Sequence, residues 1–275
     1  MTDAFGRTIT YLRISVTELC NLRCRYCMEE DGVCKKSHDD MLTEDEMIRA
    51  VEAAASLGIT KLRITGGEPL IKKNIVSICR RAAAVPGIEE VCLTSNGLLL
   101  DKLAEPLKQA GVKRLNLSLD TLDAKKYAHI TRGGSLDEFW RGFHAAMDAG
   151  FGKLKLNAVL IGGVNDDEIV PPAELTRRHP IDMRFIEMMP MCDGAGFGAD
   201  AYIPYTRVLQ ALPQLSPVPS DGGVAKLFRL PDAKGCVGLI SPVSAHFCQA
   251  CNRLRLTADG RVKPCLHSGA EYPLK

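Results

Sequence analysis

Residues 11–27 read YLRISVTELCNLRCRYC, and this stretch decides both the fold class and the chemistry to look for. Its first five residues alternate between apolar and polar side chains. In an extended chain Leu12 and Ile14 therefore share one side, and Arg13 lies on the other. The pattern predicts a strand with two different faces, followed by a loop that carries three closely spaced cysteines.

The same alternation recurs along the first two thirds of the chain. Strands are predicted at residues 11–16, 61–65, 91–94, 114–119, 154–160 and 183–188. Helical patterns separate them. One begins at Thr43 with Glu46 as a capping box, a second begins at Ser135 with Glu138, and each is expected to end at a glycine. Six strand–helix alternations predict an α/β fold with a parallel sheet, an incomplete (β/α)6 TIM-like barrel with a C-terminal β-hairpin-containing extension.

The polar faces of these strands share a chemistry. Arg13, Arg63 and Lys155 occupy strand positions of the same parity as neighbouring serine, threonine and asparagine residues. The apolar residues should lie under the helices, and the polar set should point into the barrel. A closed eight-stranded barrel fills its interior with apolar side chains, so a cationic interior favours an incomplete barrel that holds a ligand. The alternative is a solvated face of an open sheet.

Composition limits the class of protein. The chain has 275 residues and a formal net charge of +2, which gives no broad basic field for nucleic acid. Its N-terminus does not read as a signal or transit peptide, and no apolar run approaches the length of a membrane span. We therefore expect a cytoplasmic protein with no membrane partner. Disulfides are rare in that compartment, so the 11 cysteines indicate metal or redox sites.

The first cysteine group is Cys20, Cys24 and Cys27, in the loop after the first strand, where barrel enzymes place their chemistry. Thiolates at such short spacings bind iron–sulfur clusters, usually four to a cubane. Three ligands leave one iron open, which distinguishes a reactive metal centre from a structural one. Cys34 is close enough to be a fourth ligand, but its neighbouring lysines favour a surface thiol. The alternative is half of a zinc site, although zinc prefers paired two-residue spacings.

Three further cysteines form a second group, Cys248, Cys251 and Cys265. Alternating residues around Asp259 and Gly260 predict a β-hairpin that folds the last of these cysteines back toward the other two. Arg253 and Arg255 share parity, so they should project from one face of the first strand of that hairpin.

A zinc knuckle is the alternative for the second group, with His246 or His267 as the fourth ligand. Both histidines fit a surface or packed position equally well. The remaining cysteines have no ligand spacing and are predicted to be buried small hydrophobes: Cys79, Cys92, Cys192 and Cys236. Among them, Cys192 lies in a glycine-rich stretch and is a candidate reactive thiol.

The first group, with Tyr26 before its third cysteine, resembles the radical S-adenosylmethionine superfamily. Gly66-Gly67-Glu68-Pro69, directly after the second strand, is similar to the glycine–glycine–glutamate motif of that superfamily. Two glycines allow a close approach of backbone to a ligand, and a carboxylate beside them can accept hydrogen bonds from an ammonium group. By resemblance, that ammonium is the methionine amine of S-adenosylmethionine, which chelates the open iron.

Both cysteine groups together resemble one family, the GTP 3′,8-cyclases that begin molybdenum cofactor biosynthesis. The resemblance extends along nearly the whole chain, and the spacing of the second group followed by Asn-Arg-Leu-Arg-Leu is its most specific part. The shared motifs are Phe5-Gly6-Arg7, Tyr11-Leu12-Arg13-Ile14-Ser15, Lys61-Leu62-Arg63-Ile64-Thr65, Thr94-Ser95-Asn96-Gly97, Asn116-Leu117-Ser118-Leu119-Asp120, Arg184-Phe185-Ile186-Glu187, Ser241-Pro242 and residues 247–266.

This resemblance implies two [4Fe–4S] clusters and S-adenosylmethionine as cofactors. The first cluster would cleave S-adenosylmethionine to a 5′-deoxyadenosyl radical that takes a hydrogen atom from C3′ of GTP, and the C3′ radical would then bond to C8 of guanine. The second cluster would bind the guanine ring. Matching motifs place Tyr26, Gly67, Glu68, Ser118 and Met189 at the S-adenosylmethionine site, and Arg13, Arg63, Thr94, Lys155, Arg253 and Arg255 around GTP. Lys61 and Arg184 are weaker candidates.

Residues 1–190 are predicted to form the radical S-adenosylmethionine partial barrel, and residues 191–275 a second-cluster and substrate-binding region. The family implies a homodimer, a low-potential electron donor of the flavodoxin or ferredoxin kind, and a downstream cyclic pyranopterin monophosphate synthase.

The sequence departs from the family pattern in two places. Glu29 follows Met28 where proline is usual, which adds a carboxylate near the first cluster. The chain ends at Lys275 without the family's double-glycine tail, so we expect a truncated C-terminal region, with reduced turnover and intact cluster binding. Two alternatives remain open: a different radical enzyme with an auxiliary cluster, such as a peptide-modifying maturase, and a zinc-stabilised binding module.

Overall fold

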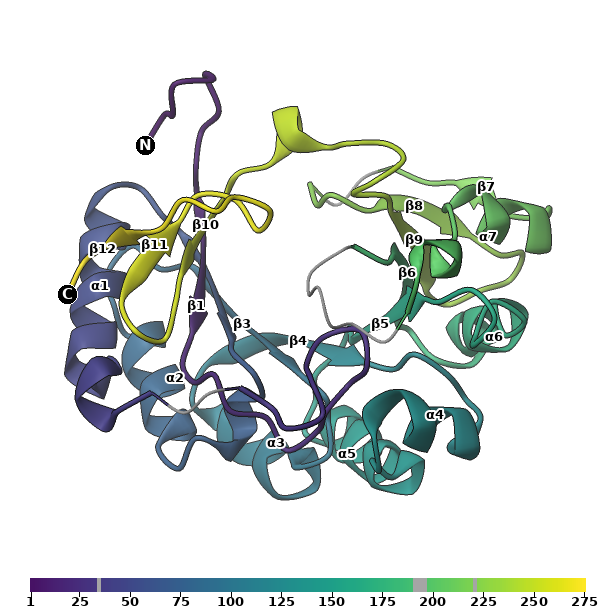
Figure 1. The fold of residues 1–275 in the computed structure, drawn as a ribbon, viewed down its shortest axis with the longest axis horizontal. Coiled ribbons are helices and arrows are strands. Elements are labelled where there is room, and N and C mark those ends of the chain that lie inside the picture. Colours follow the sequence, from purple (N-terminus) through teal and green to yellow (C-terminus); the bar gives the residue numbers. More distant parts are fainter. Residues whose placement is uncertain (34–35, 190–196, 220–221) are drawn as a thin grey trace.

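The alternating stretch that follows Thr10 forms the first strand, β1 (Tyr11–Ser15), of the computed structural model (Figure 1). The structure describes residues 1–33, 36–189, 197–219 and 222–275. Leu12 and Ile14 are buried, whereas Arg13 retains partial exposure on the other face. The alternation of apolar and polar residues therefore predicted the two faces of β1 correctly.

All six predicted strands are present, with ends that agree within two residues. Besides β1 they are β2 (Lys61–Thr65), β3 (Glu90–Ser95), β4 (Val112–Ser118), β5 (Lys155–Leu160) and β6 (Asp182–Glu187). Further strands are β7 (Ser216–Pro217), β8 (Lys226–Arg229), β9 (Cys236–Ile240), β10 (Arg253–Leu256), β11 (Arg261–Lys263) and β12 (Tyr272–Pro273).

The helices lie between the strands, as the pattern predicts. They are α1 (Glu44–Ser56), α2 (Ile75–Ala83), α3 (Leu100–Gln109), α4 (Ala124–Thr131), α5 (Leu136–Asp148), α6 (Val170–Arg178) and α7 (Thr206–Ala211). Both halves of the capping box at Thr43 and Glu46 are formed. At Ser135 the hydroxyl accepts from the amide of Glu138, which confirms the N-cap.

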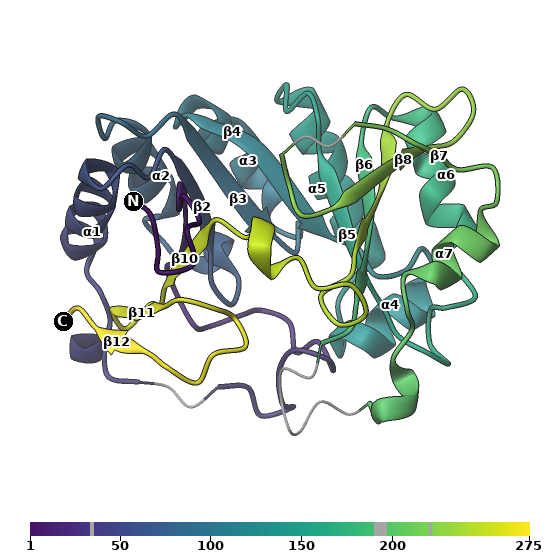
Figure 2. The ribbon, with the colours of Figure 1, turned by 90° about the horizontal axis from the view of Figure 1, so that it is seen from above.

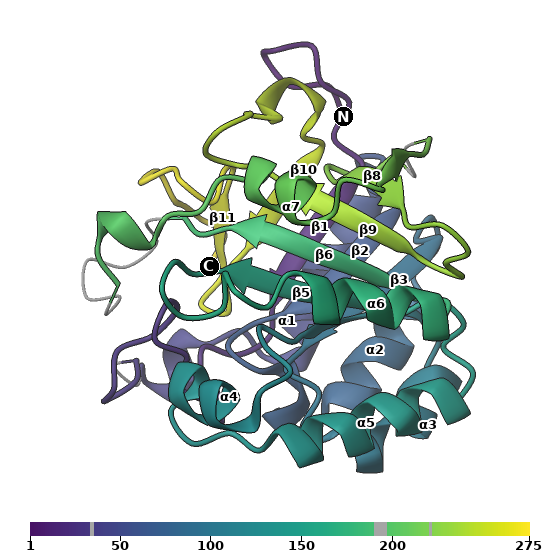
Figure 3. The ribbon, with the colours of Figure 1, turned by 90° about the vertical axis from the view of Figure 1, so that its right-hand side faces the viewer.

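One sheet of twelve strands organises the fold, in the order β12-β11-β10-β1-β2-β3-β4-β5-β6-β9-β8-β7. β1 to β6 are consecutive and parallel, and the sheet does not close on itself. Helices cover its outer side, and the sheet curves around an interior (Figures 1 and 3). The predicted incomplete barrel is confirmed.

The C-terminal part of the chain extends this sheet at both ends. β10 pairs in parallel with β1, and β9 pairs in parallel with β6. β10 and β11 form the predicted hairpin, with Gly260 at its turn in the left-handed conformation that glycine adopts readily. β10 lies beside β1 in Figure 1, and Figure 2 shows the hairpin from above, so residues distant in sequence line one barrel. The predicted domain boundary at residue 190 lies outside the described residues.

The two faces of the parallel strands have the predicted character. Leu62, Leu117 and Leu156 are buried in the apolar core under the helices. Arg63 and Lys155 point to the other side, where they are also buried, so this side is an interior rather than a solvated face. None of the helices in the described ranges is both long and apolar enough to span a membrane.

Candidate functional site

The first cysteine group lies in a tightly turned loop after β1. The amide of Cys27 and that of Met28 both donate to the carbonyl of Cys24, at 2.9 Å each. The amide of Leu22 donates to the sulfur of Cys20 at 3.3 Å, a contact that suits a thiolate ligand. Burial raises the pKa of the Cys24 thiol well above its usual value, and the neighbouring Asp120, Cys27 and Cys20 raise it further.

The glycine pair after β2 supports this loop. The amide of Gly67 donates to the carbonyl of Thr17, and that of Glu68 to the carbonyl of Leu19, at 2.8 Å each. A Cβ atom at Gly67 would lie 2.2 Å from the Leu19 carbonyl oxygen, which no real Cβ atom can do. The glycine therefore allows the cysteine loop to pack against the end of β2. This close approach is to protein backbone, whereas the sequence argument ascribed it to a ligand.

Glu68 ties the ends of two neighbouring strands together. Its carboxylate is buried and accepts from the Leu70 amide, the Ser95 hydroxyl and the Asn96 amide at 2.7–2.9 Å. Burial raises its pKa to about 7, although these hydrogen bonds lower it. Its role toward the amine of S-adenosylmethionine stays a prediction.

Asp120, at the end of β4, fixes the other side of the cysteine loop. It accepts from the hydroxyl of Tyr26 at 2.9 Å and from the amide of Val159 at 2.8 Å. Burial raises the pKa of Asp120 to about 6, against the two hydrogen bonds. Sequence reasoning assigned no role to this residue, because a carboxylate after a strand gives no sign of its partner.

Replacing Asp120 with asparagine should remove a pH dependence of stability. Because its folded-state pKa is raised from 3.8 to about 6, the contribution of Asp120 is complete below the lower value and is lost as the pH rises through the higher one. Asparagine can still accept from Val159 and can donate to Tyr26. The free energy of unfolding at pH 7 should rise by on the order of 1 kcal/mol. Denaturant titration of the metal-free chain measures this, and equal pH slopes in both proteins would contradict it.

A cavity of about 220 Å³ lies directly beside the cysteine loop. It is lined by Tyr26, Cys27, Val159, Ile186, Glu187, Met188 and Met189. Tyr26 and Met189, both predicted at the S-adenosylmethionine site, therefore meet at one cavity. Met189 also has the ring of His267 near its sulfur, at 3.2 Å, which brings the C-terminal region to the same place.

Three arginines form a row across neighbouring strands of the interior. Arg255 of β10 lies beside Arg13 of β1, and Arg13 lies beside Arg63 of β2. Burial, together with the charges of Arg63, Arg253 and Arg255, lowers the pKa of Arg13 to about 10. Within the described ranges no carboxylate pairs with these three arginines, and such a group of repelling cations is suited to an anion.

Tyr11 contacts one arginine of this row and two neighbouring cations, and the sequence analysis gave it no role. Its hydroxyl accepts from Arg63, which also donates to Thr94 at 3.1 Å. Lys61, Arg63 and Arg253 stand 5.3–5.9 Å from the centre of its ring, within range of cation–π attraction. The sequence signal was available, because Tyr11 has the same strand parity as Arg13.

A second set of polar groups lines β4 to β6. Lys155 lies between Asn116 and Asp182 in the strand register. Asp182 is fully buried, and Lys155 and Arg184 approach its carboxylate at 3.8 and 3.6 Å. The side-chain oxygens of Asn116 and Asn157 are buried and accept no hydrogen bond within the described residues. Because buried polar atoms are normally paired, these oxygens are suited to a ligand.

The second cysteine group begins on a short 3-10 helix, Cys248–Ala250. Arg7 donates to the Cys248 carbonyl at 2.8 Å and is itself held by Asp3 at 2.6 Å. Arg255 lies within electrostatic range of Cys251 and Cys265, whose charges raise its pKa, although burial lowers it more. The hairpin forms between Cys251 and Cys265, and the approach of Cys265 to the Cys248–Cys251 pair stays a prediction.

Glu187, at the end of β6, holds the segment that leads to these cysteines. Its buried carboxylate accepts from the amides of Tyr205, Val243 and Ser244 at 3.0–3.1 Å, and from the Ser244 hydroxyl. Burial raises the pKa of Glu187, but these hydrogen bonds outweigh it and the pKa is lowered. Asp3, Arg7 and Glu187 were absent from the predicted site.

The donor sets of both cysteine groups are chemically suited to iron–sulfur clusters. Each offers three thiols and no carboxylate, and thiolates are the usual ligands of such clusters. In the part of the chain that the structure describes, no three potential ligand side chains are arranged to hold a metal ion. The ligand sets therefore stay predictions.

Five cysteines belong to neither group, and three of them lie in the described residues. Cys79, Cys92 and Cys236 are buried, which confirms that prediction. Cys34 and Cys192 lie outside the described residues.

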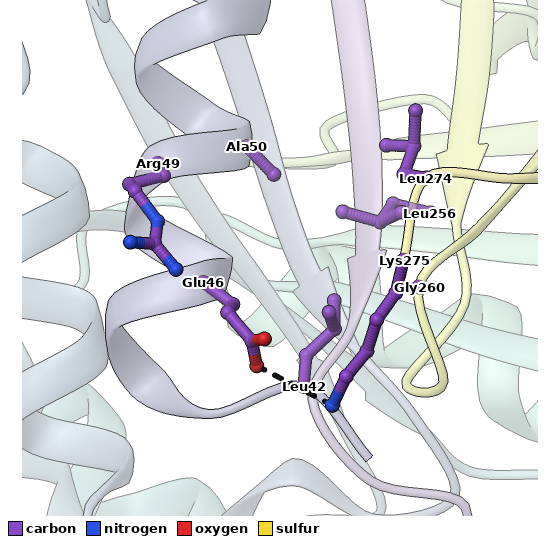
Figure 4. A pocket seen from close by; sticks show the side chains of 8 residues that line it. All are labelled: Leu42, Glu46, Arg49, Ala50, Leu256, Gly260, Leu274 and Lys275. Carbon is purple, nitrogen blue, oxygen red and sulfur yellow. Dashed lines mark ion pairs between the residues drawn. The ribbon is translucent and has the colours of Figure 1, made fainter. Parts of the chain in front are cut away.

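A larger cavity, of about 340 Å³, lies away from these groups, between α1 and the C-terminal hairpin. Figure 4 shows Lys275 reaching from the end of the chain toward Glu46 of α1, with 3.7 Å between nitrogen and oxygen. None of the predicted site residues lines it.

Comparison with known proteins identifies the family. Residues 14–175 match the Radical SAM superfamily, and residues 181–275 match Molybdenum Cofactor Synthesis C. The GTP 3′,8-cyclase of Alkaliphilus metalliredigens (strain QYMF) is 48% identical over 275 residues, covering 100% of this chain and 86% of the relative. The chain belongs to the GTP 3′,8-cyclase family. The member from Pelotomaculum thermopropionicum is 50% identical with the same coverage of both chains.

Solved structures show that the fold of this cyclase-family member is shared more widely. Streptococcus suis SuiB bound to precursor peptide SuiA superimposes with a TM-score of 0.72 over 97% of this chain and 62% of that chain. Native anSMEcpe with bound AdoMet gives a TM-score of 0.63 over 94% and 75%. Identities of 14% and 15% make these likenesses of fold alone. Membership of the Radical SAM superfamily implies a [4Fe–4S] cluster and S-adenosylmethionine as cofactors.

Proposed function

We propose that this chain is a GTP 3′,8-cyclase that catalyses the first step of molybdenum cofactor biosynthesis, as a lyase. The observation that carries the proposal is the row of Arg255, Arg13 and Arg63 across β10, β1 and β2. A triphosphate carries several negative charges, and arginine forks bind such groups bidentately. A peptide substrate would give no reason to gather these cations inside a barrel.

When bound, the first cluster and S-adenosylmethionine would supply a 5′-deoxyadenosyl radical to remove a hydrogen atom from C3′ of GTP. Bonding of C3′ to C8 of guanine would then be completed by one electron, from the proposed low-potential donor, and one proton. Cys20, Cys24 and Cys27 would hold this cluster. Tyr26, Gly67, Glu68, Ser118 and Met189 would bind S-adenosylmethionine, and two of them line the cavity beside Cys27. In support, these residues end or follow β1, β2, β4 and β6, at the edge of the parallel sheet where barrel enzymes hold their active sites.

The chain's own residues would bind and orient GTP. Arg13, Arg63, Arg253 and Arg255 would hold the triphosphate, with Thr94 fixing the Arg63 side chain. Lys155, with the buried oxygens of Asn116 and Asn157 near it, would contact the rest of the nucleotide. Fixing both ends of the substrate restricts it to one reactive orientation, which is the main contribution a protein makes to cofactor chemistry.

A second [4Fe–4S] cluster on Cys248, Cys251 and Cys265 is the finer part of the proposal. Arg7 and Glu187 fix the backbone of this segment, and Arg255 connects it to the triphosphate row. The guanine ring would bind at its open iron. A low-potential electron donor, a homodimeric state and a downstream cyclic pyranopterin monophosphate synthase complete the proposed setting.

Iron and sulfide analysis after anaerobic purification tests the cofactor part. About eight irons per chain are expected, and replacement of all three cysteines of the second group by serine should leave about four. Zinc without sulfide would contradict the proposed function. About four irons per chain in the unchanged protein would contradict the second cluster and agree with the first.

Replacing Arg255 with glutamine should weaken GTP binding. Arg255 is in the triphosphate row, so its loss should raise the Kd at least about tenfold, the factor that corresponds to one charge-assisted hydrogen bond. Arg261→Gln is the matched control, because Arg261 is on the next strand of the same hairpin but is exposed and pairs with Asp259. Anaerobic isothermal titration with GTP gives both values. Equal affinities of the two variants would refute the assignment of this row.

A further inference from the structure

Arg132, the residue after α4, has a backbone conformation that is unfavourable for a residue with a side chain. It ends the helix with φ at +54°, in the left-handed region where glycine is the usual residue. Among the described residues only Arg132 and Asp232 combine a side chain with a positive φ. A glycine at this position would end α4 without strain, and Gly133 stands directly beside it.

The guanidinium of Arg132 reaches across to the first cysteine group. Its Nη1 atom donates to the carbonyl of Arg23 at 3.0 Å and to the carbonyl of Met28 at 2.8 Å. These two residues stand immediately before Cys24 and immediately after Cys27. One side chain therefore holds both ends of the turn that carries two predicted cluster ligands.

The backbone around Arg132 is fitted to the same loop. The amide of Arg23 donates to the Thr131 carbonyl at 3.1 Å, and that of Arg25 to the Ile130 carbonyl at 2.9 Å. A Cβ atom at Gly134 would lie 2.9 Å from a methyl carbon of Leu22. The end of α4 and the cysteine loop thus pack together over several residues, with the guanidinium at the centre of the contact.

We propose that Arg132 is a positioning residue for the first cysteine group, which holds Cys24 and Cys27 in the arrangement that a cluster needs. The metal part of this inference rests on the proposed function. The geometric part does not, because it concerns the cysteine loop itself. A loop whose backbone carbonyls are held by a charged donor is already ordered before a metal centre binds, so it loses less freedom on binding. Preorganised ligands therefore bind a metal centre more tightly.

Peptide-resolved alkylation of the metal-free protein tests the geometric part. Arg132→Gly should speed alkylation of Cys24 and Cys27 about tenfold, the factor that corresponds to about 1.4 kcal/mol. Cys248 and Cys265 serve as references in the same molecule and should be unchanged. Asp232→Gly is the matched control, because it relieves the same backbone strain at an exposed site between β8 and β9.

A role confined to ending α4 makes the opposite prediction. Glycine is the best residue for such a cap, so Arg132→Gly would then leave all alkylation rates as they are. That result, or equal acceleration of every thiol in a folded variant, would overturn the proposal. Should Arg132→Gly not fold, Arg132→Lys carries the test. Lysine retains a hydrogen-bond donor but lacks the planar guanidinium. Arg132→Lys should therefore accelerate alkylation of Cys24 and Cys27 selectively, but less than Arg132→Gly does. Equal effects on all thiols would contradict the inference.

Reconstitution then tests the metal part. Arg132→Gly should retain about four irons per chain where the unchanged protein holds about eight, and Arg132→Lys should recover part of the difference. If the unchanged protein binds no iron, the proposed function fails while the alkylation result still decides the role of Arg132. If both proteins bind iron equally, with equal electron paramagnetic resonance spectra, the positioning role is wrong.

Discussion

Alanine in place of Gly67 is expected to displace the first cysteine loop and to abolish S-adenosylmethionine cleavage. The added Cβ atom would lie 2.2 Å from the Leu19 carbonyl oxygen and 2.6 Å from that of Glu18. Both neighbours are backbone atoms, so no side chain can move aside. The backbone of Gly67 has no positive φ, and the effect is therefore one of space rather than of conformation.

Relief of this clash requires the loop to leave the end of β2, with loss of the hydrogen bonds to Thr17 and Leu19. We expect the free energy of unfolding to fall by more than about 3 kcal/mol, and iron bound by the first group to be lost. Gly152→Ala is the control, because nothing lies within 4 Å of a Cβ atom there. Denaturant titration and iron analysis measure both variants. A Gly67→Ala protein that is as stable as its control would show that the loop does not pack here as described.

Replacing Glu187 with glutamine is expected to detach the second cysteine group from the barrel. The carboxylate accepts four hydrogen bonds, three of them from backbone amides. Glutamine has one acceptor oxygen, and its amide would face donors. Buried donors left without partners destabilise a protein by about 1–3 kcal/mol each. GTP affinity should therefore fall more than about tenfold.

The pH dependence of Glu187 has a definite sign. Because the pKa in the folded state is lowered from 4.5, the contribution of Glu187 to stability is present above that value and is lost as the pH falls through the folded-state pKa.

Glu174→Gln is the control for the Glu187→Gln variant, since Glu174 pairs with Arg177 at the surface of α6. Anaerobic titration of GTP against both variants decides the matter. Equal affinities would mean that Glu187 does not position the second group.

Strand parity predicted the barrel and its cationic interior because both follow from local rules. The alternating pattern around Arg13, Arg63 and Lys155 indicates that they face the side opposite the apolar residues. Because helices cover parallel sheets, this side is expected to be an interior. The capping residues Thr43 and Ser135 marked helix starts because their partners lie only three residues away. Relations between residues so close along the chain can be recognised from the sequence alone.

Contacts between distant segments could not be predicted in the same way. Nothing near Arg7 points to Cys248, and nothing near Arg132 points to the turn between Cys24 and Cys27. The strand pairing that places Arg255 beside Arg13 also depends on how the C-terminal hairpin returns to β1. The glycines after β2 were read as space for a ligand, whereas the neighbouring atoms are those of the cysteine loop.

The most direct test of the account is transfer of a label from substrate to cofactor. The protein would be incubated anaerobically with S-adenosylmethionine, a strong reductant and GTP that carries deuterium at C3′. The proposed reaction yields 5′-deoxyadenosine that has gained one deuterium, together with a GTP-derived product cyclised between C3′ and C8. Unlabelled 5′-deoxyadenosine, or none from protein with intact clusters, would contradict the assignment of GTP to the arginine-lined interior.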